Sequence, residues 1–172
     1  MSMLFGTGEL LYSDDVFTDW DGNVLARVER PRRTWRTMFT SGGTLRIVRT
    51  DGTLLFEMPE FDAEDDDECR VTAADGIPSA LVKKKKRRLA ILKVEFTVQD
   101  ADGAPMGTIT TNAAWDSFDA VDTSGAPIAT IAISGDSWTV DLRTNGSTGW
   151  DVVMLAMAVT ADETYSNLPG MN

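Results

Sequence analysis

Residues 150–161 read WDVVMLAMAVTA, a stretch in which ten of the twelve residues are apolar. Its alanine and methionine content favours a helix over a strand. A helix without a polar side must be surrounded by apolar matter, which is either protein core or lipid. Twelve residues span about 18 Å, whereas a hydrocarbon layer of about 30 Å needs about 20 residues. Because Asp162 and Glu163 follow directly, we expect a buried core helix over about 150–161 that ends at these carboxylates and does not cross a membrane.

A second pattern is an Asp-Gly or Ser-Gly pair followed by a short apolar run, which occurs at 21–22, 51–52, 75–76, 102–103 and 124–125. Such pairs are favoured in two-residue hairpin turns, where both central residues take a positive φ. The flanking segments 44–49 and 94–99 have strand-like composition and no helical periodicity. The pattern predicts a mainly β, antiparallel sheet, and closure into a barrel would remove its exposed edges.

Composition and charge exclude several classes of function. The chain has 172 residues, 27 of them acidic and 16 basic, and a net charge of −11. A field of that sign repels phosphate backbones, so we expect no nucleic-acid partner. The chain has no histidine, which excludes catalytic triads and metal sites that depend on imidazole. Glycine-rich phosphate-binding motifs are missing as well. We therefore expect no enzymatic activity, no cofactor and no metal site.

The single cysteine and the N-terminal segment bear on the cellular compartment. Cys69 cannot form an intrachain disulfide, and the charges of Asp67 and Glu68 beside it disfavour a reactive thiolate. Residues 1–6 lack the basic and long apolar regions of a signal peptide. These features predict a cytoplasmic protein.

The hairpin segments and the apolar helix together resemble the tubby C-terminal, LURP-one-related and phospholipid scramblase superfamily. The similarity extends over about 16–163 and lies in the order of DGNVLA (21–26), DGTLL (51–55), DGAPMGTI (102–109), SGAPIA (124–129) and the helix. The resemblance implies one domain over 1–172, a closed antiparallel barrel of about twelve strands that encloses the C-terminal helix. It also implies a non-enzymatic binding or scaffold module, since tubby proteins bind phosphoinositides through basic surface residues. The proline-rich leader and cysteine cluster of scramblases are absent.

Two basic segments are candidate ligand sites. The first is Lys83, Lys84, Lys85, Lys86, Arg87 and Arg88. On a strand these side chains alternate between two faces, so at least one face cannot pack on an apolar core. The segment is therefore expected to protrude or turn, where it could hold an anionic lipid headgroup or an acidic protein. The second segment contains Arg30, Arg32, Arg33 and Arg36 around Trp35. Its arginines could bind phosphate bidentately, or they could pack on the tryptophan.

An acidic run opposes these segments. It contains Glu60, Asp62, Glu64, Asp65, Asp66, Asp67 and Glu68. Calcium binding is one interpretation, although the run lacks the glycine of an EF-hand loop. The alternative to ligand recognition is that the acidic and basic runs pair, across the Asp-Gly turn at 75–76 or between subunits of an oligomer. Direct contact between the runs would favour pairing and weaken the case for a ligand. A third hypothesis, a barrel enzyme that uses only carboxylates, requires a pocket with two facing acids.

Overall fold

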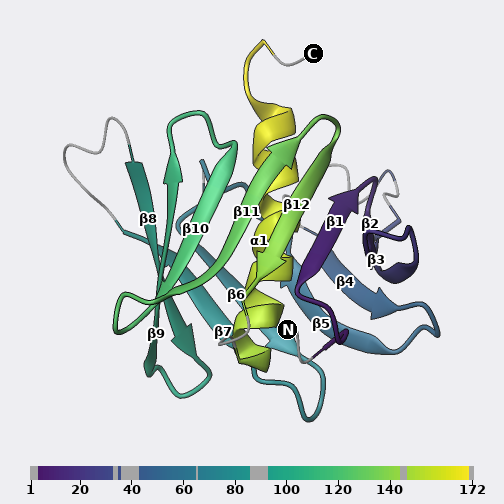
Figure 1. The fold of residues 1–172 in the computed structure, drawn as a ribbon, viewed down its shortest axis with the longest axis horizontal. Coiled ribbons are helices and arrows are strands. Elements are labelled where there is room, and N and C mark those ends of the chain that lie inside the picture. Colours follow the sequence, from purple (N-terminus) through teal and green to yellow (C-terminus); the bar gives the residue numbers. More distant parts are fainter. Residues whose placement is uncertain are drawn as a thin grey trace.

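The computed structural model describes residues 4–32, 35, 43–64, 66–85, 93–143 and 147–170. Twelve strands and one helix follow one another along this chain (Figure 1). They are β1 (Glu9–Ser13), β2 (Val16–Thr18), β3 (Val24–Glu29), β4 (Thr44–Arg49), β5 (Leu54–Pro59), β6 (Glu68–Ala73), β7 (Ala80–Lys84), β8 (Lys93–Asp100), β9 (Pro105–Asn112), β10 (Ser117–Asp122), β11 (Pro127–Ser134), β12 (Ser137–Leu142) and α1 (Thr148–Asn167).

The strands form one closed antiparallel barrel, which confirms the predicted fold class. Each strand pairs with its neighbours in sequence, and β1 closes the barrel against β12 with Leu11 opposite Thr139. The barrel therefore begins at Glu9, before the expected start of the similarity at about residue 16. Strand β1 has no Asp-Gly pair beside it, so the turn pattern did not reveal it.

The expected two-residue turn with two positive φ angles is wrong for all five glycine turns, since at 75–76 the connection between β6 and β7 covers residues 74–79 and Asp75 has no positive φ. In the hairpin between β10 and β11, Asp122 N donates to Ala126 O at 3.0 Å and Gly125 N donates to Asp122 O at 3.0 Å. Only the glycine has a positive φ, 85°. This is a three-residue loop, a type I turn followed by a left-handed glycine that forms a bulge. The turns at 21–22, 51–52 and 102–103 have the same two backbone hydrogen bonds.

These bulges also help to explain how the sheet curves. The register shifts by one residue next to each of the four turns. A bulge increases local twist and bends its strand, which favours closure of a barrel. The two-residue turn with two positive φ angles occurs instead at Asp14 and Asp15, with φ of 51° and 63°.

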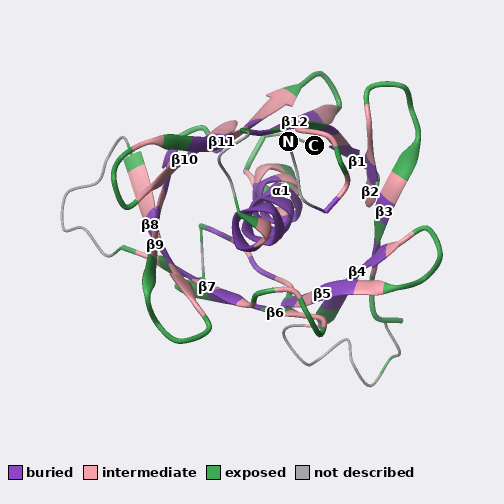
Figure 2. Cartoon of the chain, turned by 60° about the horizontal axis from the view of Figure 1, so that its bottom comes forward, coloured by how far each residue is buried: buried purple, intermediate pink, exposed green. Residues whose placement is uncertain are grey.

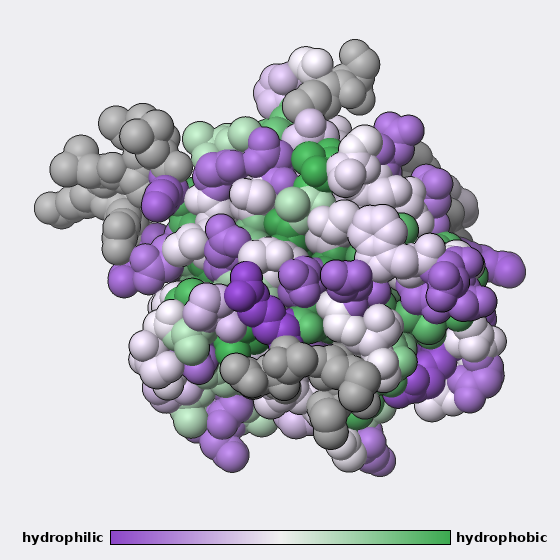
Figure 3. Space-filling view, in the orientation of Figure 1, coloured by the Kyte–Doolittle hydropathy of each residue, from purple (hydrophilic) through white to green (hydrophobic). Residues whose placement is uncertain are grey.

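Helix α1 fills the barrel, as Figure 2 shows, with residues 149–161 buried on all sides. The aliphatic side chains of Val153, Leu155 and Met157 are at most 1% exposed, and such burial contributes about 1.5–3 kcal/mol for each side chain. On the outer face of β10, β11 and β12, hydrophobic residues show only in patches between hydrophilic ones (Figure 3). Within the described residues, no helix combines the length and the apolar character needed to cross a membrane.

The helix is longer than expected, because it continues past Asp162 and Glu163 to Asn167. Two contacts of the added turn account for this difference. The Tyr165 ring packs edge-on against Trp138 at 5.7 Å between centroids, and Thr164 is fully buried. At the other end, the Ser147 side chain caps the helix by accepting a hydrogen bond from Trp150 N at 3.3 Å.

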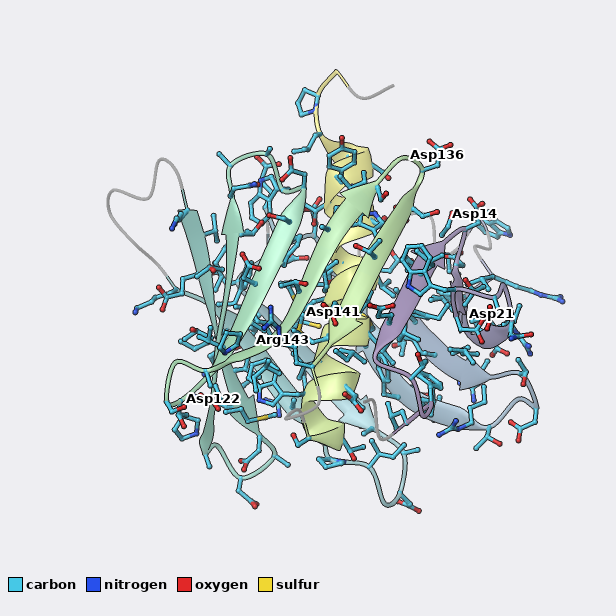
Figure 4. The ribbon with its side chains drawn as sticks, viewed as in Figure 1. Asp14, Asp21, Asp122, Asp136, Asp141 and Arg143 are labelled. Atoms are coloured by element: carbon cyan, nitrogen blue, oxygen red, sulfur yellow. The ribbon has the colours of Figure 1, made fainter. Side chains whose placement is uncertain are left out.

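The up-and-down order of the strands gives the barrel two chemically different ends. The five glycine turns and the start of α1 lie at one end, which we call the turn end. The connections β3–β4, β5–β6 and β7–β8 and the last turn of α1 lie at the opposite end. We call this second end the charged rim. Figure 4 shows Asp14 and Asp136 at the rim and Asp122 at the turn end.

Candidate functional site

The charged rim brings the three charged runs of the sequence to one end of the barrel. The basic segment with Arg32 belongs to the β3–β4 connection, the acidic run to the β5–β6 connection and the lysine run to the end of β7 and the connection after it. Because these connections alternate with the glycine turns, they all lie at the same end. In barrel order the acidic run therefore lies between two basic segments.

Lys83 and Lys84 lie in the barrel strand β7, and not in a protruding segment or turn as expected, while Lys85 follows the strand directly. The three side chains alternate between the two faces, as predicted for a strand. Lys83 and Lys85 are exposed, whereas Lys84 is partly buried on the inner face. Lys84 Nζ donates to the backbone oxygens of Ala63 at 3.0 Å and Glu64 at 2.7 Å. Lys85 Nζ forms an ion pair with Glu95 at 3.2 Å. Two of the three described lysines of the basic run, Lys84 and Lys85, thus bind oxygen atoms of this chain through their ammonium groups.

The acidic and basic runs are in direct contact where the structure describes both. Glu68 lies opposite Lys83 in the β6–β7 register, and Lys84 N donates to Asp67 O at 2.7 Å. Side chains at directly opposite positions of an antiparallel pair lie about 5 Å apart at Cβ. This arrangement favours the pairing hypothesis for these residues and weakens the case for a ligand at Lys83 and Lys84. Lys86, Arg87, Arg88, Arg33, Arg36 and Asp65 lie outside the described residues.

Residues 60–64, 66 and 67, which we call the acidic loop, also contact the end of α1. Ala63 N donates to Thr164 Oγ1 at 2.9 Å, and Asn167 Nδ2 donates to Asp62 Oδ2 at 3.2 Å. Phe61 and Ala63 are buried. The loop is therefore held between the last turn of α1 on one side and Lys84 on the other.

A cavity of about 420 Å³ opens beside the acidic loop. Its lining consists of Pro59, Glu60, Phe61, Asp62, Asp66, Glu68, Glu163 and Asn167. Asp66 Oδ2 accepts a hydrogen bond from Asp62 N, and Asp62 Oδ1 accepts one from Glu64 N, both at 2.9 Å. Over the described part of the chain, no three acidic or cysteine side chains are arranged so that they could hold a metal ion. The geometry gives the calcium interpretation no support.

Arg30, one of the arginines that could bind phosphate, instead forms an ion-pair network with Asp15 and Glu163 that sequence reasoning missed. Its guanidinium binds Asp15 through two hydrogen bonds, of 2.8 and 2.9 Å, and Glu163 through a third of 3.3 Å. The side-chain hydrogen bond to Asp15 raises the pKa of Arg30. Tyr12 Oη also donates to Asp15, at 3.1 Å, and burial raises the pKa of this phenol. Tyr12 and Asp15 are only three residues apart, and Arg30 follows the strand β3 that pairs with β2. Glu163 is 133 positions from Arg30, and no local sequence signal joins these two residues.

The carboxyl of Asp162 lies beside this network at the end of α1. It accepts a hydrogen bond from Trp138 Nε1 at 3.1 Å. Burial raises its pKa, and the hydrogen bond from Trp138 opposes this shift. A carboxylate in the last turns of a helix is also disfavoured by the helix dipole. Arg30 supplies the positive charge that these turns lack in their own sequence.

The remaining candidate residues differ in accessibility. Arg32 is exposed, and Trp35 is 72% exposed. Cys69 is buried on the inner face of β6, and burial raises the pKa of its thiol to about 12. Nearby Asp66 adds to this shift. The thiol therefore stays protonated at neutral pH, as expected, but the main cause is burial and not the charges of Asp67 and Glu68.

Comparison with known proteins supports the fold. No protein-family model matches the chain, and no curated protein does. The crystal structure of the protein AT5G01750 from Arabidopsis thaliana is similar, with a TM-score of 0.59, 14% sequence identity and coverage of 90% of each chain. This neighbour and the twelve-stranded barrel around a helix fit the fold that the resemblance implied. At this identity the likeness extends to the fold alone, a closed twelve-stranded barrel with one C-terminal helix, which is consistent with a tubby-like fold.

Proposed function

We propose that this chain is a non-catalytic binding module that docks on anionic lipid surfaces through its charged rim. The observation that carries the proposal is that Trp35, 72% exposed, lies in the same connection as exposed Arg32, and that exposed Lys83 begins the second basic segment at the same end. Tryptophan beside arginine and lysine is the composition of surfaces that bind at a membrane interface.

The position of the helix supports a binding role over a catalytic one. Barrels that bind small molecules hold them in the interior. In this barrel the interior is occupied by the side chains of α1, including Val153, Leu155 and Met157. The inert thiol of Cys69 supports the same view.

The overall charge sets the orientation of docking. The turn end carries exposed carboxylates at Asp21, Asp51 and Asp102, and the whole chain has a net charge of −11. An anionic surface therefore repels most of the molecule and attracts only the basic segments of the rim. Binding of this kind weakens steeply as ionic strength rises.

The test compares the full-length chain with two variants of equal net charge. Arg32→Ala/Lys83→Ala removes two exposed charges at the rim, and Arg70→Ala/Arg143→Ala removes two exposed charges elsewhere. Sedimentation with phosphatidylcholine vesicles and with mixed phosphatidylcholine–phosphatidylserine vesicles measures binding. Since each basic residue near the surface contributes about 1 kcal/mol, we expect the rim variant to lose about tenfold or more in affinity for the mixed vesicles.

The control variant should lose much less affinity than the rim variant. Equal loss in both variants would mean that net charge alone governs binding, which contradicts docking through the rim. Failure of the unmodified chain to bind the mixed vesicles would also contradict the proposal. If the unmodified chain binds a surface coated with polyglutamate but does not bind vesicles, the partner of the rim is an acidic protein and not a lipid surface.

The second candidate function is that of a structural protein whose charged runs neutralise each other. The contacts of Lys84 with the acidic loop favour it. It predicts that Lys84→Met lowers the free energy of unfolding more than Lys93→Met does, and that no variant binds vesicles. Urea unfolding of the two variants, beside the vesicle assay, separates this function from lipid docking.

A further inference from the structure

Lys84 is the one described lysine of the basic run that lies on the inner face of the barrel, and its ammonium group is hydrogen-bonded to the acidic loop. Lys84 Nζ has its two hydrogen-bond acceptors in the loop, the backbone oxygens of Ala63 and Glu64. An ammonium group has only three donors. The phosphate oxygens of a lipid headgroup would need the same donors that these two carbonyl groups occupy.

We propose that the acidic loop is a built-in competitor that reduces the affinity of the rim for anionic surfaces until it is displaced. This inference rests on the proposed function, because it concerns the regulation of the same site. The loop carries Glu60, Asp62, Glu64, Asp66 and Asp67 between the two basic segments. An approaching anionic surface is repelled by these carboxylates while they remain at the rim.

Backbone and side-chain hydrogen bonds hold the loop on the barrel body. Beyond the apolar burial of Phe61 and Ala63, the side-chain links include the bonds of Lys84 Nζ, the Ala63–Thr164 bond and the Asn167–Asp62 bond. Glu60 N also donates to Gly43 O at 2.9 Å, and Lys84 N donates to Asp67 O at 2.7 Å. Hydrogen bonds between neutral groups contribute about 0.5–1.5 kcal/mol each, and those to charged groups about 1.5–3 kcal/mol. A surface that supplies several phosphate groups to the basic segments competes at this scale.

Thr164→Val offers a way to weaken the loop contact without a change in charge. The substitution keeps the volume of the side chain and removes the hydroxyl that accepts from Ala63 N. Thr160→Val is the matched control, because Thr160 is also buried in α1 but bonds only within the helix, to Ala156 O at 2.9 Å. Loss of one buried hydrogen bond corresponds to about a fivefold change in an equilibrium constant.

The experiment measures binding of the unmodified chain, Thr164→Val and Thr160→Val to the mixed anionic vesicles. We expect Thr164→Val to bind about fivefold more tightly than Thr160→Val, and neither variant to bind pure phosphatidylcholine vesicles. Amide hydrogen exchange measures directly whether the acidic loop leaves the barrel body. The Ala63 amide of the unmodified chain should lose protection when the anionic vesicles are added.

A second pair of variants covers the case in which Thr164→Val does not fold. Glu64→Gln/Asp66→Asn neutralises two loop carboxylates, and Asp21→Asn/Asp102→Asn neutralises two exposed carboxylates at the turn end. The loop variant should gain more affinity than the turn-end variant. If the unmodified chain binds but both members of each pair bind equally, the loop does not regulate the rim. If no form binds the anionic vesicles, the proposed function itself fails.

Discussion

At the turn end, the carboxylate of Asp122 accepts hydrogen bonds from the turn that it stabilises, whereas at the charged rim the carboxyl of Asp162 is half-buried beside a helix end. The side-chain hydrogen bond of Ser124 and the backbone N–H of Ala126 lower the pKa of Asp122. Burial raises the pKa of Asp162. The same residue type therefore favours folding when ionised at one end and opposes it when ionised at the other. The turn end is built from local contacts, and the rim from contacts between distant segments.

The largest expected effect comes from a close approach near the turn end, at Gly107. A Cβ there would overlap the Val121 carbonyl oxygen and lie 2.9 Å from Cζ2 of Trp150, and φ is 149°. Overpacking costs about 1–3 kcal/mol and a strained backbone about 1–3 kcal/mol more. We expect Gly107→Ala to lower the free energy of unfolding by about 3 kcal/mol in urea titrations.

Gly103→Ala is the control for backbone strain alone. Gly103 has a φ of 83°, and a Cβ there would meet no atom within 4 Å. This substitution should cost about 1 kcal/mol, the usual penalty for a left-handed non-glycine residue. Equal losses in the two variants would show that the close approach of Gly107 to Val121 and Trp150 is not what requires glycine.

The second prediction removes the cation that joins three segments of the rim. Arg30→Met leaves Asp15 and Glu163 without the guanidinium that binds them. Because 34% of the Arg30 side chain is exposed, solvent reduces the cost below that of a fully buried pair. We expect a loss of about 1–2 kcal/mol of unfolding free energy. Arg27→Met, on the outer face of β3 just before Arg30, should change the free energy of unfolding by less than about 0.5 kcal/mol.

The difference between the two ends also explains what the sequence could predict. The turns at 21–22, 51–52, 102–103 and 124–125 were located from dipeptides, because a turn is a local structure. The type of these turns was not predicted, because a dipeptide does not distinguish a two-residue loop from a three-residue loop with a bulge. The contact between the acidic and basic runs followed from the turn at 75–76, since Glu68 and Lys83 are equally distant from it.

The rim network was beyond sequence reasoning for a physical reason. Arg30 and Glu163 are 133 positions apart, and only closure of the barrel around α1 brings them together. The end of the helix was misplaced for the same reason. Asp162 and Glu163 predict a helix end only if their charges remain in water, whereas here Trp138 and Arg30 bind them.

The third prediction concerns pH at the rim. Because folding raises the pKa of Asp162 above 3.8, the native state binds more protons there than the unfolded state, and stability falls as pH rises through this window. Asp162→Asn keeps an oxygen for Trp138 and removes the charge from the helix end. We expect a gain of about 0.3–1 kcal/mol at neutral pH, and the loss of stability that Asp162 causes as pH rises above 3.8 should be absent from the profile of the variant. Asp136→Asn, at an exposed position, is the control. If Asp162→Asn and Asp136→Asn both have the pH profile of the unmodified chain, the prediction is wrong.

The smallest effect tests the opposite sign at the turn end. Folding lowers the pKa of Asp122 below 3.8, so the stabilisation is present at higher pH and is lost as pH falls through the folded pKa. Asp122→Asn retains an oxygen that can accept from Ser124 N and Ala126 N, at 2.8 and 3.0 Å in the native turn, but it carries no charge. Its unfolding free energy should therefore depend less on acid than that of the unmodified chain. Urea unfolding of the two forms between about pH 2.5 and 5 measures the difference. Asp162 makes stability fall as pH rises, and Asp162→Asn removes this contribution. Asp122 makes stability rise with pH, and Asp122→Asn removes that contribution. If both substitutions change the pH dependence of stability in the same direction, the two ends of the barrel do not differ in their effect on aspartate.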